Sequence, residues 1–344
     1  MKIIKPKKLS KGSVIGIVTP SAPLPAIVPN RYERGLENLR KLGLRIIEGK
    51  YARSINGYLS GTPEQRASDI NSFLHNSDVD GILCSIGGFH YNQLLNLIDY
   101  DQAYKTPKVF LGFSDATVLQ LAFWTRCHLV TFSGPACLTQ FADYPQIDAY
   151  TEEYFKKALF STEPIGEIKP SKEWTDELLD WTTGEDVSRR RKYKLNKGWK
   201  WINEGKASGR LLGGCLSSML HLAGTTYWPD FTDCLLLIDI PEGHKLGQGM
   251  PLFEVEMHIA DLENLAVLDS IAGAIIGRPY GYSDKEHQAL YKLIRDTFGK
   301  REYPVLMDID YGHTDPLLTI PLGVFAKLDS ENSLFEITEA GVCD

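Results

Sequence analysis

Several features that would decide the class of this 344-residue protein are missing from its sequence. The six cysteines are scattered and include no C-x-x-C pair, so the sequence predicts neither a zinc ribbon nor a dithiol redox site. No apolar run approaches the roughly 20 residues of a membrane span, and the first residues contain no apolar core typical of a signal peptide. We therefore expect a cytoplasmic protein with reduced cysteines that contacts no membrane.

Positive charge is not in excess either. The formal net charge is −7, which makes nucleic acid an unexpected partner. The composition, 43% hydrophobic and 24% charged residues, is ordinary for a globular protein, and no internal repeat or low-complexity segment is present. The length indicates two domains rather than one.

Metal-ligand patterns are also absent. Glu254, Glu256 and His258 lie close together, but only Glu254 and His258 share a helical face. No third ligand follows at a familiar spacing. We therefore expect no metal site and no cofactor.

What the sequence does show is an alternation of strand and helix patterns, typical of an α/β layer structure with a mainly parallel sheet. Residues 1–165 are predicted to form a flavodoxin- or amidotransferase-like domain. Residues 166–205 are rich in tryptophan, and their hydrophobic residues show little periodicity. They are interpreted as a linker or loop. Residues 206–344 are predicted to form a smaller C-terminal α/β domain. The expected strands span 14–19, 44–47, 81–86, 108–113, 129–132, 234–240, 273–277 and 304–309, with helices at 30–42, 253–268 and 284–298, and a hairpin over 324–338.

The most informative stretch is Lys108-Val-Phe-Leu-Gly-Phe-Ser114-Asp-Ala-Thr117. A buried strand pattern runs into Gly112, Ser114 follows, and a helical pattern begins at Ala116. This arrangement is typical of a nucleophile elbow, where small neighbours leave room for an exposed serine hydroxyl. The alternative is that Ser114 or Asp115 merely caps a helix.

A hydroxyl nucleophile needs a base, and the base needs a group that orients it. His313 is the best placed of the eight histidines, because it follows a predicted strand in a loop of small and polar residues. For the acid, Asp239 closes the apolar run Leu235-Leu-Leu-Ile238, and Glu242 lies three residues further on.

Gly87-Gly88 and Cys84 also lie near the end of a predicted strand. Gly87-Gly88 could present backbone N–H groups to an oxyanion, although a plain turn is the commoner use of such a pair. Cys84 is predicted to be a core residue rather than a nucleophile, because it falls inside a buried strand.

Taken together, these residues resemble the serine peptidase family of LD-carboxypeptidases and microcin C self-immunity proteins. The resemblance covers nearly the whole chain, and the ordered set of motifs is more specific than any one string. It implies Ser114 as nucleophile, His313 as base, and the backbone N–H groups of Gly88 and Asp115 as oxyanion donors. The matching motifs are Gly16-Ile-Val-Thr-Pro-Ser21, Ser85-Ile-Gly-Gly88, Gly112-Phe-Ser-Asp-Ala-Thr117, Ser133-Gly-Pro135, Gly209-Arg-Leu-Leu-Gly-Gly214, Gly277-Arg278, Gly312-His-Thr314 and Pro321-Leu-Gly323.

The sequence departs from this family pattern at two positions. The resemblance implies a glutamate as catalytic acid, where this chain has Asp239, one methylene shorter. Either Asp239 serves or Glu242 reaches in as the alternative acid. The asparagine expected after the Gly-Gly pair is here Cys215, which leaves a substrate or structural contact open.

The tryptophans of residues 166–205 bear on the substrate. Trp174, Trp181 and Trp199 make the chain similar to the microcin-immunity branch, in which an aromatic side chain stacks on a peptidyl or aminoacyl nucleotide. The basic run at 189–194 would suit a phosphate, although a solvated loop is the commoner use of such a run. The resemblance also implies a homodimer. Two alternatives stay open: an LD-carboxypeptidase acting on murein tetrapeptide, and an inactive ligand-binding homologue.

Overall fold

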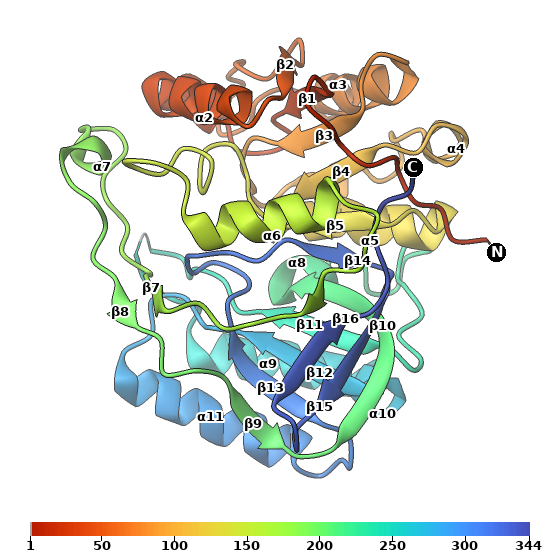
Figure 1. Ribbon diagram of the computed structural model, residues 1–344, viewed down its shortest axis with the longest axis vertical. Helices are drawn as coiled ribbons and strands as arrows, with labels where there is room; N and C mark the ends of the chain where they lie inside the picture. The colour runs from red at the N-terminus through yellow and green to blue at the C-terminus, as the bar shows by residue number, and fades with distance from the viewer. Residues whose placement is uncertain (1, 246) are drawn as a thin grey trace.

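A computed structural model describes residues 2–245 and 247–344, which form two main β-sheets surrounded by helices (Figure 1). The first sheet has the strand order β14-β5-β4-β3-β1-β2. Its strands β1 to β5 pair in parallel, and β14 pairs antiparallel with β5. The strands are β1 (Val14–Val18), β2 (Arg45–Glu48), β3 (Gly81–Cys84), β4 (Val109–Gly112), β5 (Thr131–Ser133) and β14 (Ile320–Leu322).

The second sheet lies in the lower half of Figure 1 and has the order β6-β16-β15-β10-β11-β12-β13-β9. Its centre, β10 to β13, is parallel, and its outer strands pair antiparallel. Both sheets therefore confirm the predicted α/β class. The strands are β6 (Gly166–Glu167), β9 (Lys200–Asn203), β10 (Lys206–Cys215), β11 (Leu235–Asp239), β12 (Gly273–Gly277), β13 (Val305–Ile309), β15 (Phe325–Asp329) and β16 (Leu334–Ile337).

The helices begin where the sequence provides caps. Thr62 and Gln65 form a reciprocal capping box at the start of α3, and Ser283 and Glu286 do the same for α11. The α-helices are α1 (Leu24–Ile27), α2 (Pro29–Lys41), α3 (Pro63–His75), α4 (Tyr100–Lys105), α5 (Thr117–Cys127), α6 (Ala149–Leu159), α7 (Glu185–Ser188), α8 (Leu216–Leu220), α9 (Leu252–Asn264), α10 (Val267–Ser270) and α11 (Asp284–Phe298). Two short 3₁₀ helices, η1 (Tyr91–Leu94) and η2 (Ser114–Ala116), precede α4 and α5.

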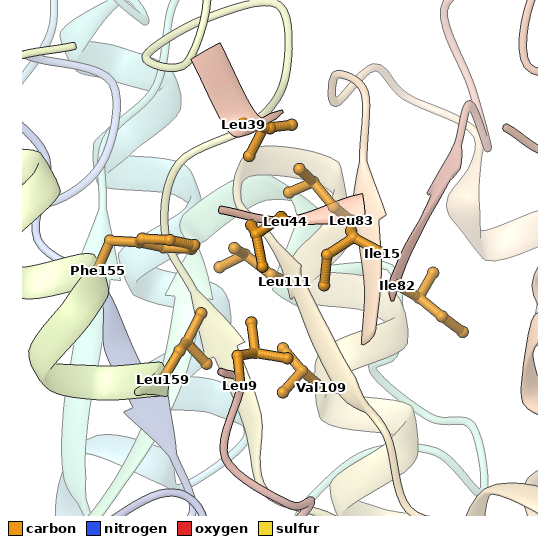
Figure 2. A pocket seen from close by; sticks show the side chains of 10 residues that line it. All are labelled: Leu9, Ile15, Leu39, Leu44, Ile82, Leu83, Val109, Leu111, Phe155 and Leu159. Atoms are coloured by element: carbon orange, nitrogen blue, oxygen red, sulfur yellow. The ribbon is translucent and has the colours of Figure 1, made fainter. Parts of the chain in front are cut away.

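The interior of the first half is apolar. Figure 2 shows a pocket there that is lined by side chains of the sheet, of α2 and α6, and of the N-terminal segment. Because every lining side chain is apolar, the pocket has no group to orient a polar ligand and belongs to the core. The lining residues are Leu9, Ile15, Leu39, Leu44, Ile82, Leu83, Val109, Leu111, Phe155 and Leu159.

Residues 166–205 are more ordered than a simple linker. Their strands β6 and β9 pair with β16 and β13 of the second sheet. Strands β7 (Glu173–Trp174) and β8 (Lys194–Leu195) pair with each other, and α7, which lies between them in the sequence, is at the upper left of Figure 1. Within residues 2–245 and 247–344, no helix is long and apolar enough to cross a membrane.

Candidate active site

Ser114 lies at a sharp turn between β4 and α5, as the predicted elbow requires. Its φ is 62°, a left-handed conformation that is uncommon for a residue other than glycine. The Gly87 backbone passes so close that an added Cβ would lie 2.8 Å from the Ser114 Cβ and 3.0 Å from its Oγ. The turn therefore holds the hydroxyl out of the helix, and Gly87 leaves the space around it open.

His313 lies beside this hydroxyl. Its Nε2 is 3.0 Å from the Ser114 Oγ, within hydrogen-bond distance of a base and its nucleophile. The ring of Phe113 packs edge-on against the imidazole, with 5.1 Å between ring centroids. His313 is supplied by the loop after β13, so the two sheets contribute one partner each.

Asp239, at the end of β11, contacts the other side of the imidazole. Its Oδ2 is 2.8 Å from His313 Nδ1, and both side chains are at least 95% buried, with exposed fractions of 2% and 5%. The contact is an ion pair whenever the imidazole is protonated. Gly312 has a φ of +102°, and a Cβ there would overlap the carboxylate, so a glycine makes this approach possible.

Glu242 does not take this place. It is exposed beyond Pro241 and forms a backbone bridge with Gly249. Among the described residues, no hydrogen bond or ion pair joins it to His313, on which it acts only as a more distant charge. The structure thus brings Ser114, His313 and Asp239 together and leaves the alternative acid outside.

The electrostatics of His313 follow from this arrangement. Burial alone would lower the pKa of the imidazole, but the adjacent Asp239 carboxylate raises it above its ordinary value. Asp239 thereby stabilises the imidazolium that forms when His313 accepts a proton. This is the role of the acid in a Ser-His-acid triad.

Gly88 and Asp115 are the residues whose backbone N–H groups are predicted to bind an oxyanion. The Asp115 N atom is 3.4 Å from the position of a Cβ added at Gly87, so the elbow and the glycine pair are in contact. Within the described part of the chain, neither the Gly88 nor the Asp115 N–H donates a hydrogen bond to a protein acceptor. Neither N–H is therefore occupied by a protein acceptor, although Asp115 itself is fully buried.

The second sheet is tied directly to the elbow helix. The Cys215 N–H at the end of β10 donates a 3.0 Å hydrogen bond to Thr117 Oγ1 at the start of α5. Gly214, with a φ of +152°, lets the strand approach, because a Cβ there would overlap the Thr117 side chain. This contact fixes the sheet that carries Asp239 against the helix that follows Ser114.

The three tryptophans have different surroundings. Trp199 packs against Phe335 in the core beside the second sheet, with 6.2 Å between ring centroids. Trp181 lies under the guanidinium of Arg31, 4.1 Å from the ring centroid. Trp174 has the cationic groups of Arg278 and Lys194 at 4.7 and 4.5 Å from its ring. Core packing is enough to explain the position of Trp199, whereas stacking on a substrate stays a prediction for Trp174 and Trp181.

The basic run at 189–194 is not a solvated loop throughout, and this part of the prediction needs correction. Arg191 is largely buried and bridges Asp143 and Asp315, with N–O distances of 2.7 and 2.6 Å. Asp315 in turn exchanges two backbone hydrogen bonds with Thr175. The segment is thus fastened to the loop that carries His313. Further cations of the run pair with carboxylates: Arg189 with Glu177, Arg190 with Glu173, and Lys194 with Asp176.

The roles of two polar side chains in the site could not be predicted from the sequence. The Asp115 side chain, considered there only as a helix cap, accepts hydrogen bonds from a separate loop. Arg191 was hidden in a run of charge, and no local signal distinguishes it from its neighbours. Within residues 2–245 and 247–344, no group of three or more His, Cys, Asp or Glu side chains is arranged to hold a metal ion.

Comparisons with known proteins identify a family for this chain. Residues 15–134 match the LD-carboxypeptidase N-terminal domain, and residues 208–328 match the LD-carboxypeptidase C-terminal domain. The microcin C7 self-immunity protein MccF of Escherichia coli is 30% identical over 96% of this chain and 94% of its own. A probable murein peptide carboxypeptidase of Bacillus subtilis is 27% identical over 99% of this chain and 96% of its own.

Solved structures are similar over the same extent. MccF in complex with aspartyl sulfamoyl adenosine superposes with a TM-score of 0.91 at 29% identity, covering 99% of this chain and 100% of that one. An MccF-like protein from Streptococcus pneumoniae in complex with AMP gives a TM-score of 0.83 at 26% identity, covering 95% and 98%. Both similarities span the two sheets and the residues between them.

Proposed function

Because this chain belongs to the LD-carboxypeptidase family, we propose that it is a serine-type amidohydrolase with a Ser114–His313–Asp239 triad. The observation that carries the proposal is the continuous chain of contacts from Ser114 Oγ to His313 Nε2 at 3.0 Å and from His313 Nδ1 to Asp239 Oδ2 at 2.8 Å. The free N–H groups of Gly88 and Asp115 beside Ser114 support it, because acyl transfer needs donors for an oxyanion.

The reaction proceeds in two halves. Ser114 Oγ attacks the carbonyl carbon of the amide while His313 Nε2 takes the hydroxyl proton, and the carbonyl oxygen becomes an oxyanion facing the Gly88 and Asp115 N–H groups. His313 then gives its proton to the leaving amine, the C–N bond breaks, and an acyl-serine remains. Water attacks this ester with His313 again as base, which releases the acid and restores Ser114. Asp239 orients the imidazole and stabilises its protonated form.

For the substrate, we propose a peptidyl or aminoacyl nucleotide of the microcin C type. The support is that MccF, which is similar over nearly the whole chain, has been solved with aspartyl sulfamoyl adenosine. The half-buried Trp174 and Trp181 offer aromatic faces in the segment that is fastened beside His313. A stacked base gains about 1–3 kcal/mol from such a face.

Murein tetrapeptide is the second candidate substrate, with the chain as an LD-carboxypeptidase. It is favoured by the pairing of Arg189, Arg190, Arg191 and Lys194 with carboxylates, which leaves these cations less available to a phosphate. The similarity to the Bacillus subtilis protein points the same way. The third reading, an inactive binding homologue, is not favoured by the contacts among Ser114, His313 and Asp239.

We further propose that the protein acts as a homodimer in the cytoplasm. The homodimer is what the family resemblance implies. Sedimentation of the purified protein tests it by measuring the mass in solution. The location is supported by six cysteines without a disulfide, five of them buried, as is usual in a reducing compartment.

The deciding experiment is a turnover screen that offers aminoacyl sulfamoyl adenosines and murein tetrapeptide to the wild type and to Ser114→Ala. We expect release of the amino acid from the nucleotide analogues, and a loss of several orders of magnitude in Ser114→Ala. Cleavage of the tetrapeptide alone would move the substrate to the murein candidate. Activity of Ser114→Ala within about tenfold of the wild type would overturn the triad.

A further inference from the structure

The loop that follows β3 is held by side chains in an unusual way. Three consecutive N–H groups of this loop donate to side chains: Phe89 to Ser21 Oγ at 3.1 Å, and His90 and Tyr91 to Asp115 Oδ2 at 2.6 and 3.1 Å. The N–H of Gly88, directly before them, donates to no acceptor in the described part of the chain. The side chains therefore hold the three amides after Gly88 and leave the Gly88 N–H, which the proposed oxyanion hole needs, without a protein acceptor.

We propose that the Asp115 carboxylate is a positioning residue that aims the Gly88 N–H at the substrate oxyanion. This inference rests on the proposed function and deepens it. Asp115 follows the nucleophile, so one residue supplies one oxyanion donor through its backbone and places the other through its side chain. The elbow and the loop are thereby fixed relative to each other, which is the preorganisation that oxyanion stabilisation depends on.

The surroundings of the Asp115 carboxylate are unfavourable for the stability of the protein. The side chain is fully buried, and within the described residues its Oδ1 has no hydrogen-bond partner. An uncompensated polar atom in the interior lowers stability. A residue that served only as a cap for η1 would not need a buried charge.

The groups facing this carboxylate come from three elements. Burial raises the pKa of Asp115 to about 6, opposed by the Tyr91 and His90 N–H groups and by the Arg66 guanidinium of α3. Arg66 also holds the same loop, with Nη1 donating to His90 O at 3.2 Å. The thiol of Cys84 and the phenol of Tyr91 are buried neighbours, and burial holds the pKa of each above its ordinary value.

This arrangement sets a pH dependence that does not come from His313. Below about pH 6 the Asp115 carboxyl takes up a proton and becomes a weaker acceptor for the two loop N–H groups. A neutral Asp115 resembles the asparagine of Asp115→Asn. The ratio of wild-type to Asp115→Asn turnover should therefore fall toward one as the pH decreases through 6, and the protonation of His313 cancels in that ratio.

The experiment measures kcat and KM of the wild type, Asp115→Asn and Asp115→Ala between about pH 8 and about pH 5. At the alkaline end we expect kcat of Asp115→Ala to be lower by about 10²-fold with little change in KM, and Asp115→Asn to be intermediate. The rate of Ser114 labelling by a fluorophosphonate should fall in the same order and requires no substrate. If Asp115→Ala folds poorly, the isosteric Asp115→Asn keeps the test usable.

Asp69→Asn is the matched control. Asp69 is also a buried carboxylate that accepts a backbone N–H, that of Tyr51 at 2.9 Å, and burial raises its pKa, but it lies on α3 outside the site. Its ratio to the wild type should not change with pH. Wild-type kcat and wild-type labelling rate in Asp115→Asn would overturn this inference, while an inactive Ser114→Ala left the proposed function standing. Turnover by Ser114→Ala would overturn both.

Discussion

Cys215 and Asp239 lie directly opposite each other in the paired parallel strands β10 and β11. These are the two positions at which the sequence differs from the residues that the family resemblance implies. The two unexpected residues are therefore neighbours, and one of them, Asp239, contacts His313. Cys215 is fully buried, and burial raises the pKa of its thiol to about 12, which makes it a neutral neighbour of the acid rather than a competing nucleophile. Cys215 therefore does not compete with the proposed role of Asp239 as the acid, which can be tested directly.

Asp239→Asn should lower kcat by about 10⁴, because the neutral amide no longer fixes the imidazole tautomer or stabilises its protonated form. Glu242→Gln removes a carboxylate of the same neighbourhood that does not contact His313, and it serves as the control with nearly unchanged kcat. Steady-state kinetics on one substrate compare the two. A severe loss in Glu242→Gln beside a mild one in Asp239→Asn would show that the acid has been assigned wrongly.

The pH dependence of kcat/KM should show an acid limb set by His313. The imidazole is the base only when neutral, and its pKa is raised above the usual value of about 6.5 by Asp239. Activity therefore falls as the pH decreases through that raised value. In Asp239→Asn the residual activity should persist to lower pH, because burial then acts on the imidazole without the opposing charge. An acid limb at the same pH in both proteins would contradict this account.

The tryptophans should separate into binding and packing residues. Trp199→Ala should lower the free energy of unfolding by about 2 kcal/mol, since the ring packs against Phe335 but is only half-buried, and should leave KM unchanged. Trp174→Ala or Trp181→Ala should raise KM for an aminoacyl nucleotide by roughly 5- to 150-fold, the loss of one stacked base. Denaturant unfolding and KM values measure the two effects. Unchanged KM in both variants would favour the murein substrate.

Arg191→Ala should both destabilise the protein and lower kcat. The substitution leaves Asp143 and Asp315, each 11% exposed, without their cation, and breaking such a pair costs about 3 kcal/mol. It also loosens the segment fastened beside His313, which protease cleavage within residues 175–192 would detect. Arg190→Ala is the matched control, because Arg190 is 55% exposed and its pair with Glu173 contributes about 0–1 kcal/mol. Equal effects of the two substitutions would contradict a specific role for Arg191.

Local sequence patterns were enough to place most helices and strands. The structure gives α11 over Asp284–Phe298 and β12 over Gly273–Gly277, the ranges predicted from periodicity and caps. Pairing between distant segments was not predictable in this way. Nothing near Ile320–Leu322 indicates that β14 joins the first sheet, and the four residues of β9 carry no sign of their partner β13. Such pairings depend on the whole fold rather than on a local period.

The sequence was enough to predict which residues form the site. It was not enough to predict the hydrogen bonds and ion pairs that position them. Ser114, His313 and Asp239 each follow a recognisable strand, and strand ends are where such sites form. The choice between Asp239 and Glu242 needed the position of the strand end. The Asp115 carboxylate was hidden because its partners, His90 and Tyr91, lie on another segment and use only their backbone.

The pairing of β14 with β5 has a consequence for synthesis of the protein in the cell. A ribosome that has just made β5 must add nearly 190 residues before Ile320–Leu322 exist to pair with its open edge. Until then the open edge of β5 exposes unpaired backbone N–H and C=O groups, which can pair with strands of other chains. A nascent chain of the first 165 residues should therefore need a chaperone or aggregate, and the loop with His313 can join the elbow only after β13 has been made.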